Sequence, residues 1–583
     1  VVLGEIEKMK SGLTQPKSVL GIEIGDVHTR GHLFDIVENS YRLIASSSAP
    51  TTSFYPILDI GDAIFEVLSR IQEICGRTLI EKSGELIIPA LPTGDGVDQF
   101  FISTSCFSSL QVVAVGLLND VSLDSARKLC NATYANLLES IGINDRRSYS
   151  QQLDTLLTIR PDLVIFTGGT DGGASRSLLR TAELVSTALQ LLPRGTRPQI
   201  LYCGNQVLSA QLKDVFERYT TVRSAPNIRP SFEGENLEPA LTELDALVME
   251  KMNEEIGGLK RTSPLCTTPP QLKNQGFMRM IKFLGRQYDP LKGVLGLDVG
   301  MNHSMAAFSN DRVSILNTFK IGMGSGLEAF LRKGDIKDIS RWLTFTVPDT
   351  VVSDALWNRS LFPLSVAATK EEIAIEQAVL RQMLQAMMID LESREIMPSS
   401  RFEPIVLSGC TVSHVADPVR SLLLALDGIQ PLGISPLILD KHSLLPLLGT
   451  IAAHNSLLAV QLLESTAFSN LATVVNITSK TRAGSPLLYA RLDYADGNSF
   501  EVEVKQGSII SLPLAPGATG LLRLRLTSRA EIEELALIRE PIKVQGGVCG
   551  VVVDARGRPI VLPEDQGRRI ELLKEWEFLL GAA

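Results

Sequence analysis

One short pattern occurs in both halves of this chain, and it constrains the fold more than any other feature. Residues 19–34 read VLGIEIGDVHTRGHLF, and residues 294–308 read VLGLDVGMNHSMAAF. In each copy an apolar run leads to an acidic residue (Glu23 or Asp298), one apolar residue and a glycine, and a second apolar run follows. This pattern predicts a β-hairpin with a tight glycine turn. Backbone N–H groups of such a turn bind phosphate, and a neighbouring carboxylate can hold a divalent cation. Two facing hairpins would clamp a nucleotide triphosphate.

The domain organisation follows from the length and from changes of pattern along the chain. A chain of 583 residues is too long for one core, at a prior of roughly 150 residues per domain. After residue 111 strands alternate with helices, one of which we expect at 122–142, so this part predicts a parallel sheet. After about residue 470 apolar and polar residues alternate, which predicts strands. We therefore expect an α/β protein with a first half at 1–110, an inserted α/β subdomain at 111–256, a linker and helix at 257–290, a second half at 291–469 and a small all-β domain at 470–583.

Composition narrows the classes of function. The net charge of −9 argues against a nucleic-acid-binding surface. The longest apolar stretch, 444–463, is broken by Pro446 and Gly449, so it predicts a buried helix pair and not a membrane span. The N-terminus is charged almost at once, unlike a signal peptide, and the seven cysteines are scattered without a CxxC pair. We expect a cytoplasmic protein with reduced thiols that binds neither nucleic acid nor a membrane.

The order of the motifs resembles that of the actin/Hsp70/sugar-kinase superfamily. The two hairpins are followed by a strand that ends in Ser408-Gly409-Cys410 and by a helix of small residues around Gly449. In that superfamily two similar domains close over ATP, and the corresponding order is first phosphate loop, second phosphate loop, adenosine loop and a closely packed helix. The resemblance implies a duplicated actin-like ATPase fold, with the inserted subdomain and the C-terminal β domain as additions.

Five stretches are similar to the glutamate mutase L (MutL-like) family within this superfamily. The most specific is PDLVIFTGGTDGG at 161–173, and the others are 341–345, 375–378, 439–449 and 548–559. The resemblance implies an ATP-using accessory factor, chaperone-like or reactivating, for an adenosylcobalamin-dependent mutase. Fold alone does not decide between this role and others.

The resemblance also implies roles for residues of the two hairpins. Glu23 and Asp298 would lie on either side of a Mg²⁺ ion that accompanies ATP or ADP. The resemblance also implies that phosphates contact Gly25, Asp26, Thr29 and Arg30 in the first loop and Gly300 and Asn302 in the second. The alternative is that both segments are ordinary hairpin turns with acidic residues beside them.

Two positions depart from the pattern of the superfamily, in which Ser or Thr usually follows the glycine. Here Asp26 follows Gly25, and Met301 follows Gly300. A second carboxylate in the first loop would repel phosphate, since two unit charges ~4 Å apart interact by ~4 kcal/mol at an effective dielectric near 20. The site is therefore either impaired, so that nucleotide use is weak or lost, or strongly dependent on Mg²⁺.

Three further glycine-containing segments are candidates for ligand binding. Gly322, Gly324 and Gly326 precede a helix, which suggests an anion site or a tight helix-entry turn. Ser408, Gly409 and Cys410 stand where the adenosine loop is expected, and we assign Cys410 no reactivity. The turn at 168–173 follows a strand where parallel sheets place ligands, and it either binds a ligand or only shapes the subdomain.

Three functions remain open from the sequence. The first is a nucleotide-binding protein with weak or no ATPase activity that acts on a protein partner, for which a cobalamin-dependent mutase is the candidate. The second is a nucleotide-independent assembly protein of actin-like fold that self-associates. The third is a small-molecule kinase, which would need a catalytic carboxylate that no motif identifies.

Overall fold

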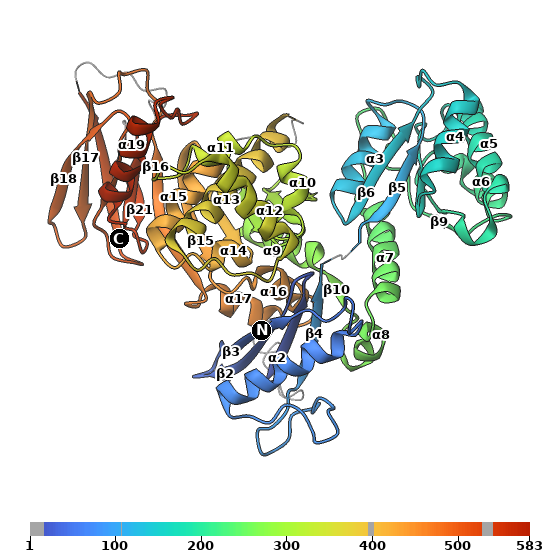
Figure 1. Cartoon of the computed structure of the whole chain (residues 1–583), viewed down its shortest axis with the longest axis horizontal. Helices are drawn as coiled ribbons and strands as arrows, with labels where there is room; N and C mark the ends of the chain where they lie inside the picture. The colour runs from blue at the N-terminus through green and yellow to red at the C-terminus, as the bar shows by residue number, and fades with distance from the viewer. Residues whose placement is uncertain (1–16, 106–107, 394–400, 528–539, 583) are drawn as a thin grey trace, which may run out of the picture. The chain divides into compact units, whose positions relative to one another are not determined.

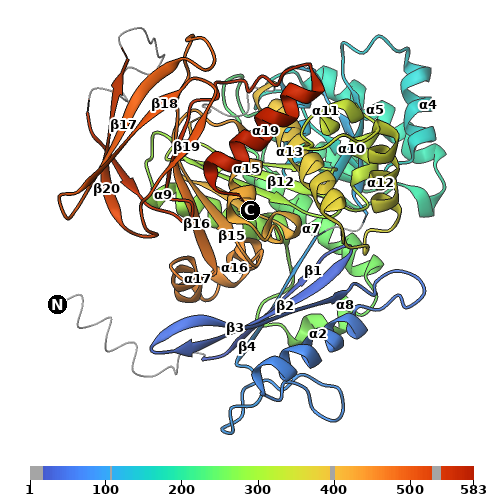
Figure 2. The ribbon, with the colours of Figure 1, turned by 60° about the vertical axis from the view of Figure 1, so that its left-hand side comes forward.

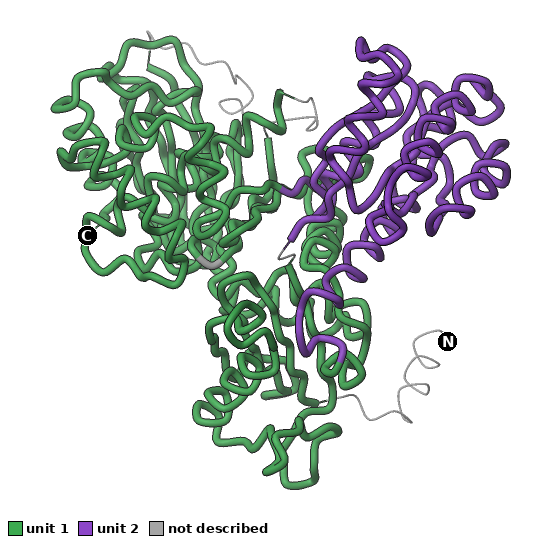
Figure 3. The backbone as a smooth tube through the Cα atoms, turned by 45° about the vertical axis from the view of Figure 1, so that its right-hand side comes forward, with its two compact units in different colours: residues 1–105, 261–315, 319–583 green, residues 106–260, 316–318 purple. Residues whose placement is uncertain are grey.

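A computed structural model describes residues 17–105, 108–393, 401–527 and 540–582. Most of the expected lead-in at 1–18 therefore lies outside the described residues. The chain divides into two compact units, which are coloured separately in Figure 3. Unit 1 consists of residues 1–105, 261–315 and 319–583, and unit 2 consists of residues 106–260 and 316–318.

The first half of unit 1 is a five-stranded mixed sheet covered by one long helix. The strand order is β10-β4-β1-β2-β3, in which β1 to β3 form an antiparallel meander and β4 and β10 run parallel to β1. The bounds are β1 (Val19–Ile24), β2 (His28–Val37), β3 (Ser40–Pro50), β4 (Gln99–Thr104), β10 (Gln271–Leu272) and α2 (Ile60–Cys75). The buried apolar face of α2 packs on β2 and β3, where Gly31 leaves room for Val67. The first predicted hairpin is thereby present as β1 and β2 (Figure 2).

The second half repeats the strand arrangement of the first in a larger sheet. Its order is β13-β12-β11-β14-β15-β16-β22-β19; β11 to β13 correspond to the first meander, and β14 and β15 to the two parallel strands. The strand bounds are β11 (Val294–Val299), β12 (Ser304–Ser309), β13 (Ser314–Phe319), β14 (Ile405–Ser408), β15 (Gly433–Asp440), β16 (Phe468–Asn476), β19 (Ile509–Leu512) and β22 (Val551–Asp554). The helices are α10 (Leu327–Leu331), α11 (Ile336–Ser340), α12 (Asp349–Leu361), α13 (Lys370–Ser393), α14 (Cys410–Ser413) and α15 (Pro418–Ile429). The duplicated α/β fold expected from the repeated motif is confirmed.

Two helices that cross at glycines lie between the halves of unit 1. α9 (Lys273–Gln287) meets α16 (Leu445–Ala452), and α17 (Ser456–Leu463) follows. A Cβ on Gly449 would lie 1.8 Å from the Gly276 carbonyl oxygen, and one on Gly276 would lie 2.0 Å from the Pro446 oxygen. The guanidinium of Arg279 donates to the Gly449 carbonyl. The buried helix pair predicted at 444–463 is confirmed, and none of the helices in the described part of the chain is long and apolar enough to cross a membrane.

The C-terminal segment is built mainly of strands, as expected, but part of it extends the sheet of the second half. β16 runs through residue 470, where the sequence pattern suggested a boundary, and pairs with β15 on one side and β22 on the other. A four-stranded sheet of order β18-β17-β20-β21 lies beside this extension (Figure 1). The two share a hydrophobic core. The remaining bounds are β17 (Pro486–Tyr494), β18 (Ser499–Lys505), β20 (Thr519–Leu526), β21 (Ile542–Gln545) and α19 (Gln566–Leu580).

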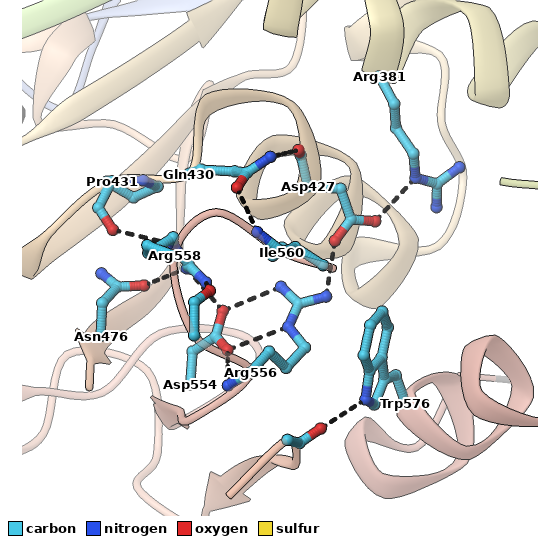
Figure 4. Close-up of polar contacts among 12 residues, drawn as sticks. Arg381, Asp427, Gln430, Pro431, Asn476, Asp554, Arg556, Arg558, Ile560 and Trp576 are labelled. Carbon is cyan, nitrogen blue, oxygen red and sulfur yellow. Dashed lines mark hydrogen bonds and ion pairs between the residues drawn. The ribbon is translucent and has the colours of Figure 1, made fainter. Parts of the chain in front are cut away.

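A buried network of ion pairs ties the C-terminal segment to the helices of the second half (Figure 4). The Arg556 guanidinium donates to Asp554 through Nε and Nη2, at 3.0 and 2.9 Å, and to Asp427 on α15 through Nη1, at 2.6 Å. Arg381 on α13 donates to the other oxygen of Asp427, at 2.9 Å. The side chain of Arg556 is fully buried against Trp576 of α19, 4.7 Å from the ring centroid.

Unit 2 contains a five-stranded parallel sheet of order β6-β5-β7-β8-β9. Its strands are β5 (Leu110–Val115), β6 (Ala135–Ile141), β7 (Leu163–Phe166), β8 (Gln199–Tyr202) and β9 (Val222–Ser224). Its helices are α3 (Ser122–Asn131), α4 (Tyr149–Ile159), α5 (Ser175–Leu191), α6 (Ser209–Phe216) and α7 (Glu238–Glu255), and it has short 3₁₀ turns at Arg194–Thr196 and Gln206–Leu208. Helix α8 (Leu259–Thr262) begins in unit 2 and ends in unit 1, where a 3₁₀ turn at Ser263–Leu265 follows. The expected parallel sheet is confirmed. The single helix expected at 122–142 is wrong, because α3 ends at Asn131 and β6 follows in the same stretch.

Candidate nucleotide-binding cleft

The two hairpin turns have the same local geometry. In the first, the Gly25 N–H donates to the His28 carbonyl at 3.0 Å; in the second, the Gly300 N–H donates to the His303 carbonyl at 3.2 Å. Each acidic residue stands two positions before its glycine, in a fully buried strand. Glu23 and Asp298 therefore occupy equivalent positions in the two halves of unit 1.

A lysine that the sequence analysis did not single out lies between these two carboxylates. Lys273 Nζ is 3.2 Å from Glu23 Oε1 and 3.0 Å from Asp298 Oδ1. All three residues are buried, with exposed fractions of 7% for Lys273, 5% for Glu23 and 1% for Asp298. Burial opposes the charge on Lys273, but Asp298 and Glu23 outweigh it and raise the pKa above its usual value, so the ammonium stays protonated. This buried site of Glu23, Asp298 and Lys273, which we call the candidate cleft, thus contains a cation of the protein's own.

This arrangement does not fit the Mg²⁺ ion expected between Glu23 and Asp298. The ammonium fills the bridging position, and a divalent ion ~4 Å from it would be repelled by about 8 kcal/mol at an effective dielectric near 20. Glu23 Oε2 and Asp298 Oδ2 are buried without a hydrogen-bond partner among the described residues, so they remain open to a donor. Within those same residues, no group of three or more His, Cys, Asp or Glu side chains is arranged to hold a metal.

The tips of the two hairpins are also in contact. The side chain of Asn302 in the second turn forms a hydrogen bond with Asp26 in the first. Burial raises the pKa of Asp26 to about 7, although Asn302 and the charge of Lys273 both act to lower it. The first turn therefore presents a carboxyl group that is only partly ionised at neutral pH, which reduces the repulsion of phosphate that the sequence suggested.

We expect Asp26→Asn to raise the thermal midpoint of the protein at pH 8 and to change it little at pH 4. The folded protein holds the Asp26 proton up to about pH 7, whereas the unfolded chain releases it near pH 4. The stability of the wild type therefore falls as the pH rises between these values. Thermal unfolding of both proteins at a series of pH values measures the difference. Asp311→Asn, at an exposed turn, is the control, and an equal response of both variants would contradict the assignment.

The glycines at 322–326 pack against the second hairpin. A Cβ on Gly322 would lie 2.6 Å from the Met301 carbonyl oxygen, and one on Gly326 would lie 2.2 Å from the Asn302 carbonyl oxygen. The Gly324 N–H donates to the Met301 carbonyl at 2.8 Å. Close approach of two backbones accounts for these glycines, and the helix that follows, α10, has only five residues.

Other residues expected to contact nucleotide make contacts within the protein. Thr29 Oγ1 is hydrogen-bonded to Thr51 Oγ1 at 3.0 Å, and Thr51 also donates to the Gly25 carbonyl. Arg30 Nη1 lies 4.0 Å from Glu23 Oε1. Thr29 and Thr51 thus stabilise the first turn, and Arg30 lies beside its carboxylate Glu23.

The segment expected to form the adenosine loop follows β14 in the second half. Ser408 Oγ donates to the buried Asp440 at 3.0 Å. Gly409 has a φ of +104°, and a Cβ there would lie 2.3 Å from the Val299 carbonyl oxygen. The loop therefore packs against the end of β11 in the second hairpin. Cys410 begins α14. The structure thus brings Ser408 and Gly409 close to the strand that carries Asp298.

The glycine-rich turn at 168–173 belongs to unit 2 and follows β7. Asn205 holds the turn by donating to the Gly173 carbonyl at 2.7 Å and accepting from the Gly172 N–H at 3.1 Å. Asp171 Oδ1 accepts hydrogen bonds from the Gln206 N–H and from Asn227. These contacts give the turn a structural role.

The two halves of unit 1 share the strand order of a duplicated α/β fold. The MutL protein family matches residues 19–467, which is more than half of the chain, and the chain belongs to this family. Protein MutL of Clostridium tetanomorphum is 23% identical over 155 residues. These residues make up 26% of this chain and 32% of that protein, so the match spans about a third of the relative's length.

Solved structures that align with this chain have low sequence identity to it. The ethanolamine utilization protein EutJ from Carboxydothermus hydrogenoformans is 8% identical, and the alignment covers 75% of this chain and 90% of that one with a TM-score of 0.27. A glycerol dehydratase reactivase is also 8% identical, with 75% and 100% covered and a TM-score of 0.30.

Proposed function

We propose that this protein is an actin-like accessory factor that binds ADP or ATP between its two hairpins and acts on a protein partner. The observation that carries the proposal is the meeting of Glu23 and Asp298, from equivalent positions of the two halves, at one buried cation. A ligand held by both turns would fix the distance between the halves. The crossing of α9 and α16 supports this view, because it is the close backbone contact about which the halves would move.

The partner we propose is an adenosylcobalamin-dependent mutase. Membership of the MutL family supports this choice. Closure of the halves around nucleotide would change the surface offered to the partner, and the differential affinity of nucleotide for the open and closed forms would set the size of the effect. We propose weak or absent turnover of ATP, because Asp26 and Met301 stand where hydroxyl side chains are usual in the superfamily.

Calorimetry with ADP tests the nucleotide part of this proposal. We expect Gly300→Ala to weaken ADP binding at least tenfold, because its Cβ would lie 2.4 Å from the His303 carbonyl oxygen and would distort the second turn. Gly334→Ala is the matched control, since its Cβ would make only an ordinary contact at 3.4 Å. Equal ADP affinity in both variants, or no binding to the wild type, would contradict the proposal.

The partner is tested separately with a cobalamin-dependent mutase that has lost activity through damage to its cofactor. We expect this protein and ATP together to restore mutase activity, and neither alone to do so. If the Gly300→Ala variant restores the same mutase activity as the wild type, the effect on the mutase does not depend on nucleotide binding between the hairpins.

A second candidate, a nucleotide-independent assembly protein, is favoured by one observation. Lys273 lies between Glu23 and Asp298, and Asp26 contacts Asn302, so these side chains would have to move to admit phosphates between the two turns. If these side chains permanently exclude nucleotide, the protein acts only by assembling with other copies of itself. Light scattering that rises with protein concentration and is unaffected by ADP would support this candidate.

A further inference from the structure

Lys273 lies between the carboxylates of the two hairpins, and this position leads to a prediction about metal dependence. We infer that the Lys273 ammonium is the resident cation of this cleft, so that the phosphates of a nucleotide are bound there without a divalent metal. The nucleotide part of this inference rests on the proposed function, whereas the part that concerns metal does not. Lys273 Nζ bridges the two carboxylates at 3.2 and 3.0 Å, and all three groups are buried.

The lysine is held in place by its helix. Lys273 is the first residue of α9, directly after β10, and so belongs to neither hairpin. Three residues along, Gly276 packs against the Pro446 carbonyl and against Thr450. Arg279 binds the Gly449 carbonyl and, at 3.2 Å, Gln271. The position of the ammonium is therefore set by helix α9, which packs against α16, and not by a loop.

The charges of Glu23 and Asp298 are balanced by two cations of the protein without a metal ion, and the carboxyl group of Asp26 is only partly ionised at neutral pH. Lys273 and Arg30 carry two positive charges against those of Glu23 and Asp298, and Arg30 lies 4.0 Å from Glu23. An ammonium has three donors, and Glu23 Oε1 and Asp298 Oδ1 lie 3.2 and 3.0 Å from its nitrogen. Lys273 also acts electrostatically on Asp26 in the first turn, so its charge reaches the place where phosphate would bind.

Binding of Mn²⁺ alone, followed by electron paramagnetic resonance, tests the metal part without any nucleotide. We expect no Mn²⁺ site in the wild type, and a site at least about tenfold tighter in Lys273→Met, because removal of the ammonium frees two carboxylates. Lys282→Met, on the same helix, is the control and should behave like the wild type. A wild type that binds one Mn²⁺ in this assay would overturn the inference, even if the Lys273→Met variant does not fold.

Calorimetry of the wild type with ADP, in EDTA and in Mg²⁺, tests the nucleotide part. We expect the two affinities to agree within about twofold, and we expect Lys273→Met to lose at least about tenfold in EDTA. Binding to the wild type that requires Mg²⁺ would overturn the inference and leave the proposed function standing. If ADP binds under neither condition, the proposed function fails, and the Mn²⁺ measurement still decides whether Lys273 excludes metal.

Discussion

Replacement of Gly449 by alanine is expected to destabilise unit 1 by about 3 kcal/mol or more, which is the upper end of the usual range for overpacking. The new Cβ would lie 1.8 Å from the Gly276 oxygen and 2.4 Å from its carbonyl carbon. Both atoms belong to the backbone of α9, so no side chain can turn aside and the helices must separate. This cost exceeds the ~1 kcal/mol that alanine gains over glycine within a helix.

Urea unfolding followed by tryptophan fluorescence measures this effect, because Trp342, Trp357 and Trp576 all lie in unit 1. Gly567→Ala is the matched control: the residue is also in a helix, and its Cβ would make only an ordinary 3.4 Å contact with Asp565. The control should be unchanged or slightly more stable. A Gly449→Ala variant that is as stable as the control would show that the crossing tolerates a wider spacing.

The second large effect is expected from Arg556→Met in the buried network of Figure 4. Removal of the guanidinium leaves Asp427 and Asp554 buried with only part of their partners, and such a loss typically costs about 3–5 kcal/mol. The change should lower the urea midpoint reported by the tryptophans, and the fluorescence of Trp576, which lies 4.7 Å from the guanidinium, should change in the folded protein.

Arg523→Met provides the control for the network, because Arg523 is 55% exposed and pairs with Asp493 at the surface. Exposed pairs contribute roughly 0–1 kcal/mol, so the control should hardly move the midpoint. Burial acts against the charge of Asp554, but Arg556 and Arg558 outweigh it and lower the pKa. The stability that Asp554 contributes is therefore present above pH ~4 and is lost only in strong acid. Equal midpoints for the two variants at pH 7 would contradict this account.

The parts of the fold that the sequence predicts well are those with a strong local signal. Glu23-Ile24-Gly25 and Asp298-Val299-Gly300 each end an apolar run, and both became hairpins. Pro446 and Gly449 interrupt an apolar stretch, which became a helix pair. By contrast, residues 135–141 follow α3 without a turn signal such as Gly or Pro, so a helical pattern was expected where β6 forms.

The residues whose role was not predicted from the sequence are charged residues that become buried through tertiary contacts. Lys273 begins a helix after a linker, where a lysine is normally exposed, and only the presence of two carboxylates in buried strands suggested that a cation was needed. Arg556 begins the sequence RGRP at 556–559, which is typical of an exposed turn. Its side chain is nevertheless fully buried by α15, β22 and α19. The partners in both cases come from distant parts of the chain.

The order of the strands within each sheet also determines when each part of the protein can fold during synthesis. β10, at the edge of the first sheet, is made only after the whole of residues 106–260, and β22, inside the second sheet, is made about 75 residues after its neighbour β16. Unit 2 is almost continuous in sequence and can fold as soon as it leaves the ribosome. The sheets that contain β10 and β22 must wait with unpaired strand edges, so a chain released before β22 would expose the edge of β16 to aggregation.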